Sequence, residues 1–252
     1  MELKLTIDRG NTAIKGAVWD SDDRIVGTLR GDADKAAGVL ARDLAVMYNN
    51  GEPFSAAIYC SVVASDRDDD VETITPLCRK FIELSSLTPL PFSIEYRTPR
   101  TLGADRIAAI AGALSIAGDS RPLLVADIGT AVTYDFVGTG RRYVGGNIAP
   151  GVDMRLRALR AFTDALPSVH PDGDTPVWGT TTNEAMRSGA VRGVCAELEA
   201  YHRAAGPETL AVLTGGSARM LAEKGLLTFD YILDQCLVHK GLNAIINYNE
   251  DK

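Results

Sequence analysis

The sequence Asp8-Arg9-Gly10-Asn11-Thr12 follows an alternating apolar segment at residues 3–7, and Asp127-Ile128-Gly129-Thr130-Ala131 follows the apolar run 123–126. The two Asp-x-Gly copies are 119 residues apart (127 − 8), close to half of the 252-residue chain. A strand followed by the same turn, repeated at half-length spacing, indicates an internal duplication. We therefore predict one domain at residues 1–118 and a second at residues 119–252.

The first turn has the chemistry of a phosphate site. Its glycine lets the backbone approach an anion, and Asn11 and Thr12 offer polar side chains beside it. The Asp8 carboxylate needs a cation between itself and phosphate, so we expect Mg²⁺ to bridge them directly or through water. Lys15 on the next strand can reach the same anion. A single Asp-x-Gly is most simply an ordinary hairpin turn, but two copies at corresponding positions favour phosphate binding.

Strands and helices alternate along the whole chain, which predicts an α/β fold. The patterns predict a hairpin at 3–19, strands at 56–63, 123–128, 133–137 and 209–213, and helices at 32–49, 104–117, 152–162, 183–204 and 240–247. The acidic run at residues 66–70 is interpreted as a solvated loop or helix start.

Composition narrows the class of protein. A net charge of −7 argues against broad nucleic-acid binding, which needs clustered Lys and Arg. No apolar run is long enough to span a bilayer, the N-terminal residues do not resemble a secretory signal, and the four cysteines form no Cys-x-x-Cys pair. We expect a cytoplasmic protein without nucleic-acid or membrane partners.

Several common catalytic motifs are missing from the sequence. It contains no Gly-x-x-x-x-Gly-Lys-Ser/Thr, no His-Glu-x-x-His and no Gly-x-Ser-x-Gly. The three histidines, His170, His202 and His239, are expected to be solvated or to cap helices.

Paired Asp-x-Gly turns in a duplicated chain resemble the actin, hexokinase and sugar-kinase superfamily, and the chain is similar over nearly its whole length to type III pantothenate kinases. The motifs that carry the resemblance are the two turns, Gly103-Ala104-Asp105-Arg106, Gly145-Gly146-Asn147-Ile148-Ala149-Pro150-Gly151, Leu166-Pro167 and Gly241-Leu242. The resemblance implies duplicated ribonuclease-H-like domains, as in actin-like ATPases. Each is expected to hold a mixed five-stranded sheet flanked by helices, with the active site in the interdomain cleft. The C-terminal helix is expected to be able to pack back on the first domain.

The implied activity is ATP-dependent phosphorylation of pantothenate to 4′-phosphopantothenate, the first step of coenzyme A biosynthesis. The implied cofactors are Mg²⁺ with ATP and a monovalent cation, K⁺ or NH₄⁺, and the implied assembly is a homodimer. Two alternatives are another small-molecule kinase of the superfamily and an ATP-binding transcriptional accessory factor without catalysis.

The resemblance also implies roles for individual residues. Asp105 is the expected general base, Asp127 the ligand of the monovalent cation, and Asp8 the residue that holds magnesium. The residues expected to contact ATP are Asp8, Arg9, Gly10, Asn11, Thr12, Ala13, Ile14, Lys15 and Thr130. Those expected to contact pantothenate are Tyr96, Gly103, Ala104, Asp105, Arg106 and Thr182.

Some of these positions have simpler interpretations. Asp105 can cap a helix while Arg106 is solvated, and Thr182 can be a helix N-cap, with Thr180 and Thr181 beside it as alternatives. Arg9 stands where the family usually has a small or aliphatic residue, and its guanidinium is expected either to contact phosphate or to turn towards solvent.

Overall fold

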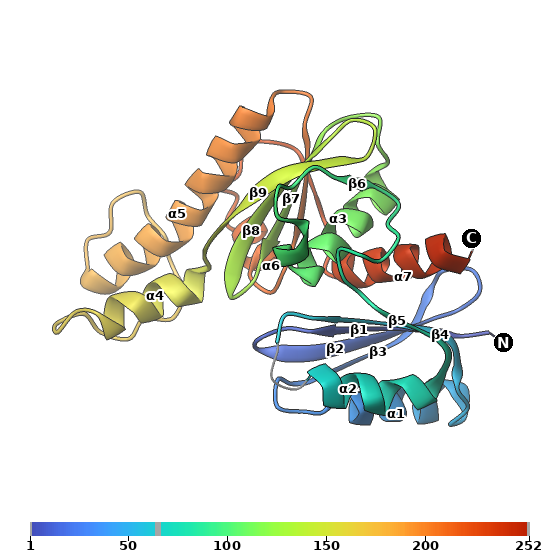
Figure 1. The fold of residues 1–252 in the computed structure, drawn as a ribbon. Coiled ribbons are helices and arrows are strands. Elements are labelled where there is room, and N and C mark those ends of the chain that lie inside the picture. Colours follow the sequence, from blue (N-terminus) through green and yellow to red (C-terminus); the bar gives the residue numbers. More distant parts are fainter. Residues whose placement is uncertain (1, 64–66, 251–252) are drawn as a thin grey trace. The chain divides into compact units, whose positions relative to one another are not determined.

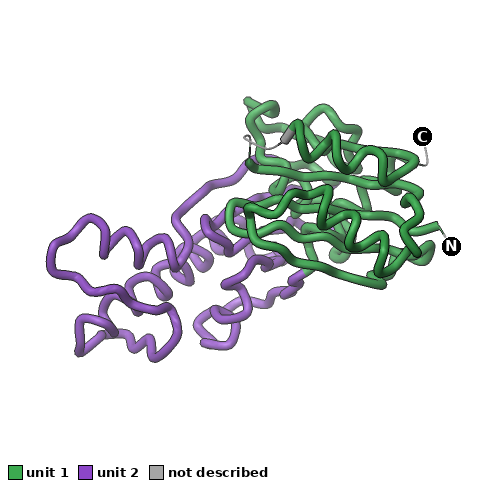
Figure 2. Tube along the Cα trace, turned by 90° about the horizontal axis from the view of Figure 1, so that it is seen from below, with its two compact units in different colours: residues 1–118, 141–143, 236–252 green, residues 119–140, 144–235 purple. Residues whose placement is uncertain are grey.

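The computed structural model describes residues 2–63 and 67–250, which form two compact units (Figures 1 and 2). The first unit runs to Gly118, adds Arg141–Tyr143 and resumes at Cys236. The second unit consists of Asp119–Gly140 and Val144–Gln235.

The first unit is built on a five-stranded mixed sheet of order β3-β2-β1-β4-β5. Its strands are β1 Lys4–Arg9, β2 Ala13–Trp19, β3 Ile25–Asp32, β4 Phe54–Ser61 and β5 Cys78–Glu83. Strand β1 is antiparallel to β2 and parallel to β4, so the predicted hairpin is confirmed. Strand β3 was not predicted, and because it runs to Asp32, the predicted helix begins later, at Ala37.

Helices cover both faces of this sheet (Figure 1). Helices α1 (Ala37–Asn49) and α2 (Arg67–Ile74) lie on one face, and α3 (Ala104–Ala117) and α7 (Leu237–Glu250) lie on the other. Apolar side chains of β1 and α1 form the core beneath the first face, among them Leu5, Ile7, Leu40 and Leu44. Two 3₁₀ turns, Thr75–Leu77 and Pro99–Thr101, complete the helices of this unit.

The C-terminal helix α7 packs closely on α3 in the first unit. A Cβ atom placed on Gly241 would lie 1.8 Å from the Ala108 carbonyl oxygen, and one on Gly112 would lie 2.1 Å from the Leu237 carbonyl oxygen. Only glycine at these two positions allows the backbones to approach so closely.

The second unit repeats the topology of the first. Its strands are β7 Leu123–Ile128, β8 Ala131–Gly138, β9 Arg142–Pro150, β10 Leu210–Thr214 and β11 Tyr231–Leu233, with β9 beginning in residues of the first unit. The order β9-β8-β7-β10-β11 matches β3-β2-β1-β4-β5 strand for strand. The short strand β6 (Ser93–Ile94) pairs with Arg142 and Tyr143 at the start of β9. The second sheet therefore has six strands. The prediction of five was wrong because β6 adds a strand next to β9.

One face of the second sheet is covered by α4 (Val152–Ala161), α5 (Thr182–Ala205) and α6 (Ala218–Glu223). Leu156 and Val191 pack from these helices onto Leu124 and Tyr134 of the sheet. Within residues 2–63 and 67–250, no helix combines the length and apolar character needed to cross a bilayer.

Candidate active site

The first Asp-x-Gly turn joins β1 to β2. The Gly10 N–H donates to the Ala13 carbonyl oxygen at 3.0 Å, which closes the turn, and Asn11 and Thr12 at its tip are exposed. Asp8 pairs in register with Lys15 across the hairpin, and their charged groups are 4.0 Å apart. The turn thus presents backbone N–H groups, two polar side chains and an ammonium group beside one carboxylate.

The surroundings of the Asp8 carboxylate favour a bound cation. The side chain of Asp8 is only 13% exposed. Its pKa is raised to about 6, mainly by burial, while the charge of Lys15 lowers it and the charge of Asp105 raises it. Burial raises the pKa of the Cys60 thiol, and the charges of Asp8 and Asp105 raise it as well.

This electrostatic setting fits Mg²⁺ bound together with a nucleotide. Among residues 2–63 and 67–250, no group of three or more His, Cys, Asp or Glu side chains is arranged to hold a metal ion. Mg²⁺ that accompanies a nucleotide does not need one, because one or two carboxylates and the phosphates supply its ligands. A partly buried carboxylate with a raised pKa gains most from such a cation.

Asp105 lies in the first turn of α3. The N-cap residue of α3 is Gly103, so the interpretation of Asp105 as the N-cap is wrong. The Asp105 carboxylate accepts a 2.8 Å hydrogen bond from the Arg106 backbone N–H. Burial raises its pKa, while this N–H and the Arg106 charge oppose the rise. A carboxylate with a raised pKa is a better proton acceptor for a hydroxyl group.

Arg106 is not solvated, contrary to the simpler interpretation. It is 5% exposed, and its guanidinium donates to the Tyr143 hydroxyl at 2.8 Å. The guanidinium also lies 5.9 Å from the centre of the Tyr96 ring, and the Tyr96 and Tyr143 rings are 5.9 Å apart. Two tyrosines therefore orient this arginine. Tyr143 was not predicted, because no motif contains it and only the path of β9 brings it to Arg106.

Arg9 takes neither of the two expected orientations. It is 2% exposed, and its guanidinium is 3.1 Å from the carboxylate of Asp70, which is also 2% exposed. Asp68 and Asp69 are exposed, as expected for the acidic run, but Asp70 is buried, so the solvated interpretation fails there. Asp66 of the same run lies outside the described residues. The Arg9 side chain is thus an internal contact of the turn and not one of its exposed groups.

His239 is likewise not solvated. It is 6% exposed and its Nδ1 lies 2.9 Å from the Thr6 hydroxyl oxygen, which also accepts the indole N–H of Trp19 at 3.0 Å. Burial, together with the positive charge of Lys15, lowers its pKa to about 3. The imidazole is therefore neutral and holds α7 to β1.

The second Asp-x-Gly turn joins β7 to β8 and is enclosed by two glycines. The Gly151 N–H donates to the Thr130 carbonyl oxygen at 3.0 Å, and a Cβ on Gly151 would lie 2.6 Å from that oxygen. Gly215, at a φ of +97°, lies against Asp127, whose carboxylate oxygen would be 2.4 Å from a Cβ there. The loops after β9 and β10 thus meet at Asp127 and Thr130 within the second unit.

The three threonines at the start of α5 make different contacts. Thr181 is the N-cap, accepting from the Glu184 N–H at 3.2 Å, and Thr180 donates to the Glu184 carboxylate from both its N–H and its hydroxyl. Thr182 is therefore not the cap, and it is exposed at the first position of the helix.

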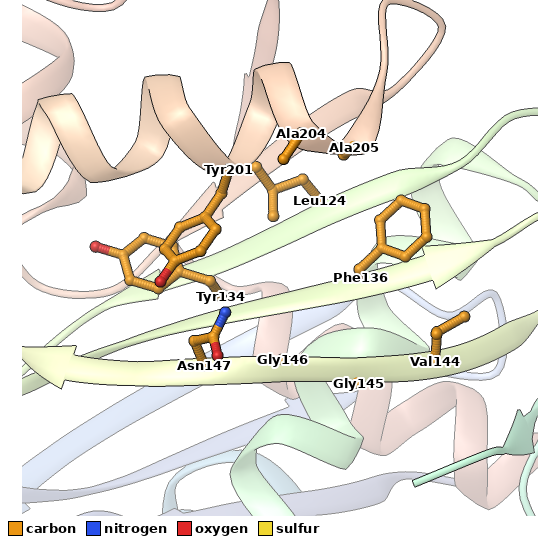
Figure 3. A pocket seen from close by; sticks show the side chains of 10 residues that line it. All are labelled: Leu124, Tyr134, Phe136, Val144, Gly145, Gly146, Asn147, Tyr201, Ala204 and Ala205. Carbon is orange, nitrogen blue, oxygen red and sulfur yellow. The ribbon is translucent and has the colours of Figure 1, made fainter.

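Figure 3 shows a cavity of about 300 Å³ in the second unit, between α5 and the strands beneath it. Its lining is mostly apolar and contains Gly145 and Gly146 of β9. The lining residues are Leu124, Tyr134, Phe136, Val144, Gly145, Gly146, Asn147, Tyr201, Ala204 and Ala205. The lining contains no charged side chain, and its polar side chains are those of Tyr134, Asn147 and Tyr201.

Known proteins were compared with the chain as a whole. The family model described as type III pantothenate kinase matches residues 4–204. The type III pantothenate kinase of Phocaeicola vulgatus is 38% identical over 251 residues, which cover 98% of this chain and 99% of that protein.

Solved structures at lower identity share the fold. A conserved Campylobacter jejuni protein assigned to the Baf family of transcriptional activators superposes with a TM-score of 0.63 at 20% identity, covering 98% of this chain and 100% of that one. A ROK family glucokinase from Streptomyces griseus, in complex with glucose and AMPPNP, gives a TM-score of 0.54 at 14% identity, covering 99% and 100%.

Proposed function

Because the chain belongs to the type III pantothenate kinase family, it is a kinase that phosphorylates pantothenate in coenzyme A biosynthesis, and we propose how its residues divide this reaction. The observation that carries the proposal lies in the first unit. There Asp105 and Arg106 open one helix, and the charge of Asp105 acts on Asp8 of the phosphate turn. A proton acceptor, an anion-binding group and a phosphate turn thus occur together.

Pantothenate is held through its carboxylate by Arg106, whose planar guanidinium forms strong charge-assisted bonds with such a group. The hydrogen bond to Tyr143 and the Tyr96 ring support this role, since both fix the guanidinium before substrate arrives. Gly103, Ala104 and Thr182 complete the substrate contacts in this proposal.

In the first unit, Asp8 and residues 10–15 contact the phosphates of ATP, and Thr130 of the second unit is a further proposed phosphate contact. Asp8 is the ligand of Mg²⁺, which when bound neutralises charge on the phosphates. Asp105 accepts the proton of the pantothenate hydroxyl as that oxygen attacks the γ-phosphorus, while the bond from the γ-phosphorus to the β–γ bridging oxygen breaks and ADP leaves. The burial that raises the pKa of Asp105 supports this assignment.

Asp127 holds the monovalent cation in the second unit. The support is its position in the turn enclosed by Gly151 and Gly215, where carbonyl oxygens of Gly129 and Thr130 also gather. Carboxylate and carbonyl oxygens are suitable ligands for a hard cation such as K⁺.

The protein is a homodimer of the cytoplasm in this proposal. Large apolar side chains are strongly exposed on the second unit: Ile148 (66%), Phe162 (88%), Val177 (64%) and Trp178 (84%). Exposed apolar side chains that lie together mark an interaction surface, and in this proposal these side chains form the dimer contact. The buried thiols Cys60 and Cys195 support a reducing compartment.

The experiment that tests the function is ATP turnover with pantothenate, with and without K⁺. We expect turnover that requires pantothenate and is stimulated by K⁺. A panel of sugars and small acids distinguishes another kinase specificity, and ATP binding without turnover of any of these acceptors would favour a non-catalytic accessory protein. No turnover in either salt would contradict the proposal.

A further inference from the structure

We propose that the buried Arg9–Asp70 ion pair is a positioning device that fixes the first phosphate turn for ATP. The inference rests on the proposed role of the Asp8 turn in holding ATP. It assigns a function to Arg9, a residue that departs from the usual family pattern, and to Asp70, which no sequence motif contains.

Asp70 is the centre of a buried polar cluster. Its carboxylate is 3.1 Å from the Arg9 guanidinium and accepts the Tyr59 hydroxyl at 2.7 Å and the Ala37 N–H at 2.9 Å. The Arg9 guanidinium also donates to the Lys35 carbonyl oxygen at 3.0 Å. Arg9, Tyr59 and Asp70 are each at most 2% exposed. The cluster therefore joins β1, β4, α2 and the start of α1 at one point.

The cluster lies directly behind the phosphate turn. Arg9 is the last residue of β1, and Gly10 of the turn follows it. Successive side chains of a strand point to opposite faces, so Asp8 faces the side of Asp105 and Cys60 while Arg9 faces α1 and α2. At the tip, Asn11 and Thr12 are exposed, so the side chain of Arg9 is the nearest fully buried anchor of the turn.

Single and double substitutions of a buried ion pair change stability differently, and this difference separates a positioning role from a purely structural one. Removing one partner leaves an uncompensated buried charge and destabilises strongly, whereas replacing both partners with neutral groups of similar size is often nearly neutral. A purely structural pair is thus restored by the double substitution. A positioning pair recovers its stability but not its function.

The test compares Arg9→Met, Asp70→Asn and the double variant in the full-length protein. We expect each single variant to lower the melting temperature and the double variant to recover most of that loss. The double variant should still show an ATP KM raised about tenfold, with the pantothenate KM within about twofold of wild type, because only the phosphate turn is displaced. A double variant with a wild-type ATP KM would overturn the proposal.

A matched control is Tyr59→Phe, which removes one hydrogen bond to Asp70 and keeps the ion pair. We expect its ATP KM to stay within about twofold of wild type. An increase equal to that of the double variant would show general loosening and refute the specific role of the pair. If the double variant does not fold, Arg9→Lys keeps the charge without the planar fork, and an unchanged ATP KM in that variant would count against the proposal.

Asp8→Asn separates this inference from the function proposed for the turn. If Asp8→Asn leaves both kcat and the ATP KM unchanged, the turn does not hold Mg²⁺ and ATP as proposed. If Asp8→Asn is impaired while the double variant behaves as wild type, only the positioning role is wrong.

Discussion

Asp8 and Asp105 are both kept in surroundings that disfavour their charged forms. Burial is the largest cause in each case, and Asp105 adds a like charge near Asp8. Each of these buried carboxylates lowers the stability of the unliganded protein, and binding of a cation or a proton removes that penalty. This is the expected trade-off between stability and activity at a site that binds a charged ligand.

Asp8→Asn should stabilise the unliganded protein at alkaline pH. The folded-state pKa of about 6 lies above the ordinary 3.8, so the unfavourable contribution of Asp8 appears as pH rises through this window and is complete above it. We expect the variant to be more stable by on the order of 1–3 kcal/mol at pH 8 and indistinguishable near pH 4, measured by urea unfolding without Mg²⁺ or nucleotide. Equal stabilities at pH 8 would contradict the raised pKa. In wild type, the Mg²⁺ concentration needed for half-maximal turnover should rise below pH 6, because protons compete with Mg²⁺ for Asp8.

Among the secondary-structure elements, the crossing of α3 and α7 has the strictest packing requirement. A methyl group on Gly241 would collide with the Ala108 carbonyl oxygen, and the backbone cannot move aside without disturbing both helices. Gly189 in α5 is a natural contrast, because no atom lies within 4 Å of a Cβ built there.

Gly241→Ala should therefore destabilise the protein by more than about 2 kcal/mol, as expected when a close contact must open. Gly189→Ala should be neutral or stabilising by up to about 1 kcal/mol, because alanine has the higher helix propensity. Denaturant unfolding of both variants checks the pair. Similar effects of the two substitutions would mean that the helices are not in such close contact.

At this scale the sequence predicted some elements and not others. The two hairpins and the helix after Gly103 were predictable, because alternation, glycine turns and helix stops agree locally. Strand β3 alternates in burial, but glycines occupy two of its four less exposed positions, so its apolar alternation in sequence is weak. Asp70 has the same chemistry as its exposed neighbours, and its burial depends on Arg9, a residue far away in sequence. Local patterns do not contain such a partner.

At the scale of the whole molecule, the sequence predicted the duplication from two short turns, and the strand orders of the two sheets repeat it. The short strand β6 was not predictable, because two residues carry no periodicity. The two Asp-x-Gly turns and the Gly-x-Asp-Arg motif that contains Asp105 could also be identified in the sequence. The tyrosine that orients Arg106 was not, because Tyr143 reaches it only through the path of β9.

The exposed apolar side chains of the second unit predict the assembly state. Phe162→Ser combined with Trp178→Ser should shift the protein from dimer to monomer in sedimentation, since large apolar anchors dominate such interfaces. Leu87→Ser is the matched control, because Leu87 is 78% exposed on the first unit and should leave the dimer intact. A wild-type monomer, or a double variant that remains dimeric, would contradict the proposed interface.

The most direct test of the account is the turnover and pantothenate binding of Asp105→Asn. The amide keeps the size of the carboxylate and cannot accept the hydroxyl proton, so we predict a kcat lower by about 10²–10⁴-fold with pantothenate affinity within about threefold of wild type. Steady-state kinetics and calorimetric titration with pantothenate measure the two quantities. Wild-type turnover with unchanged binding would show that Asp105 is not the base and contradict the proposed mechanism.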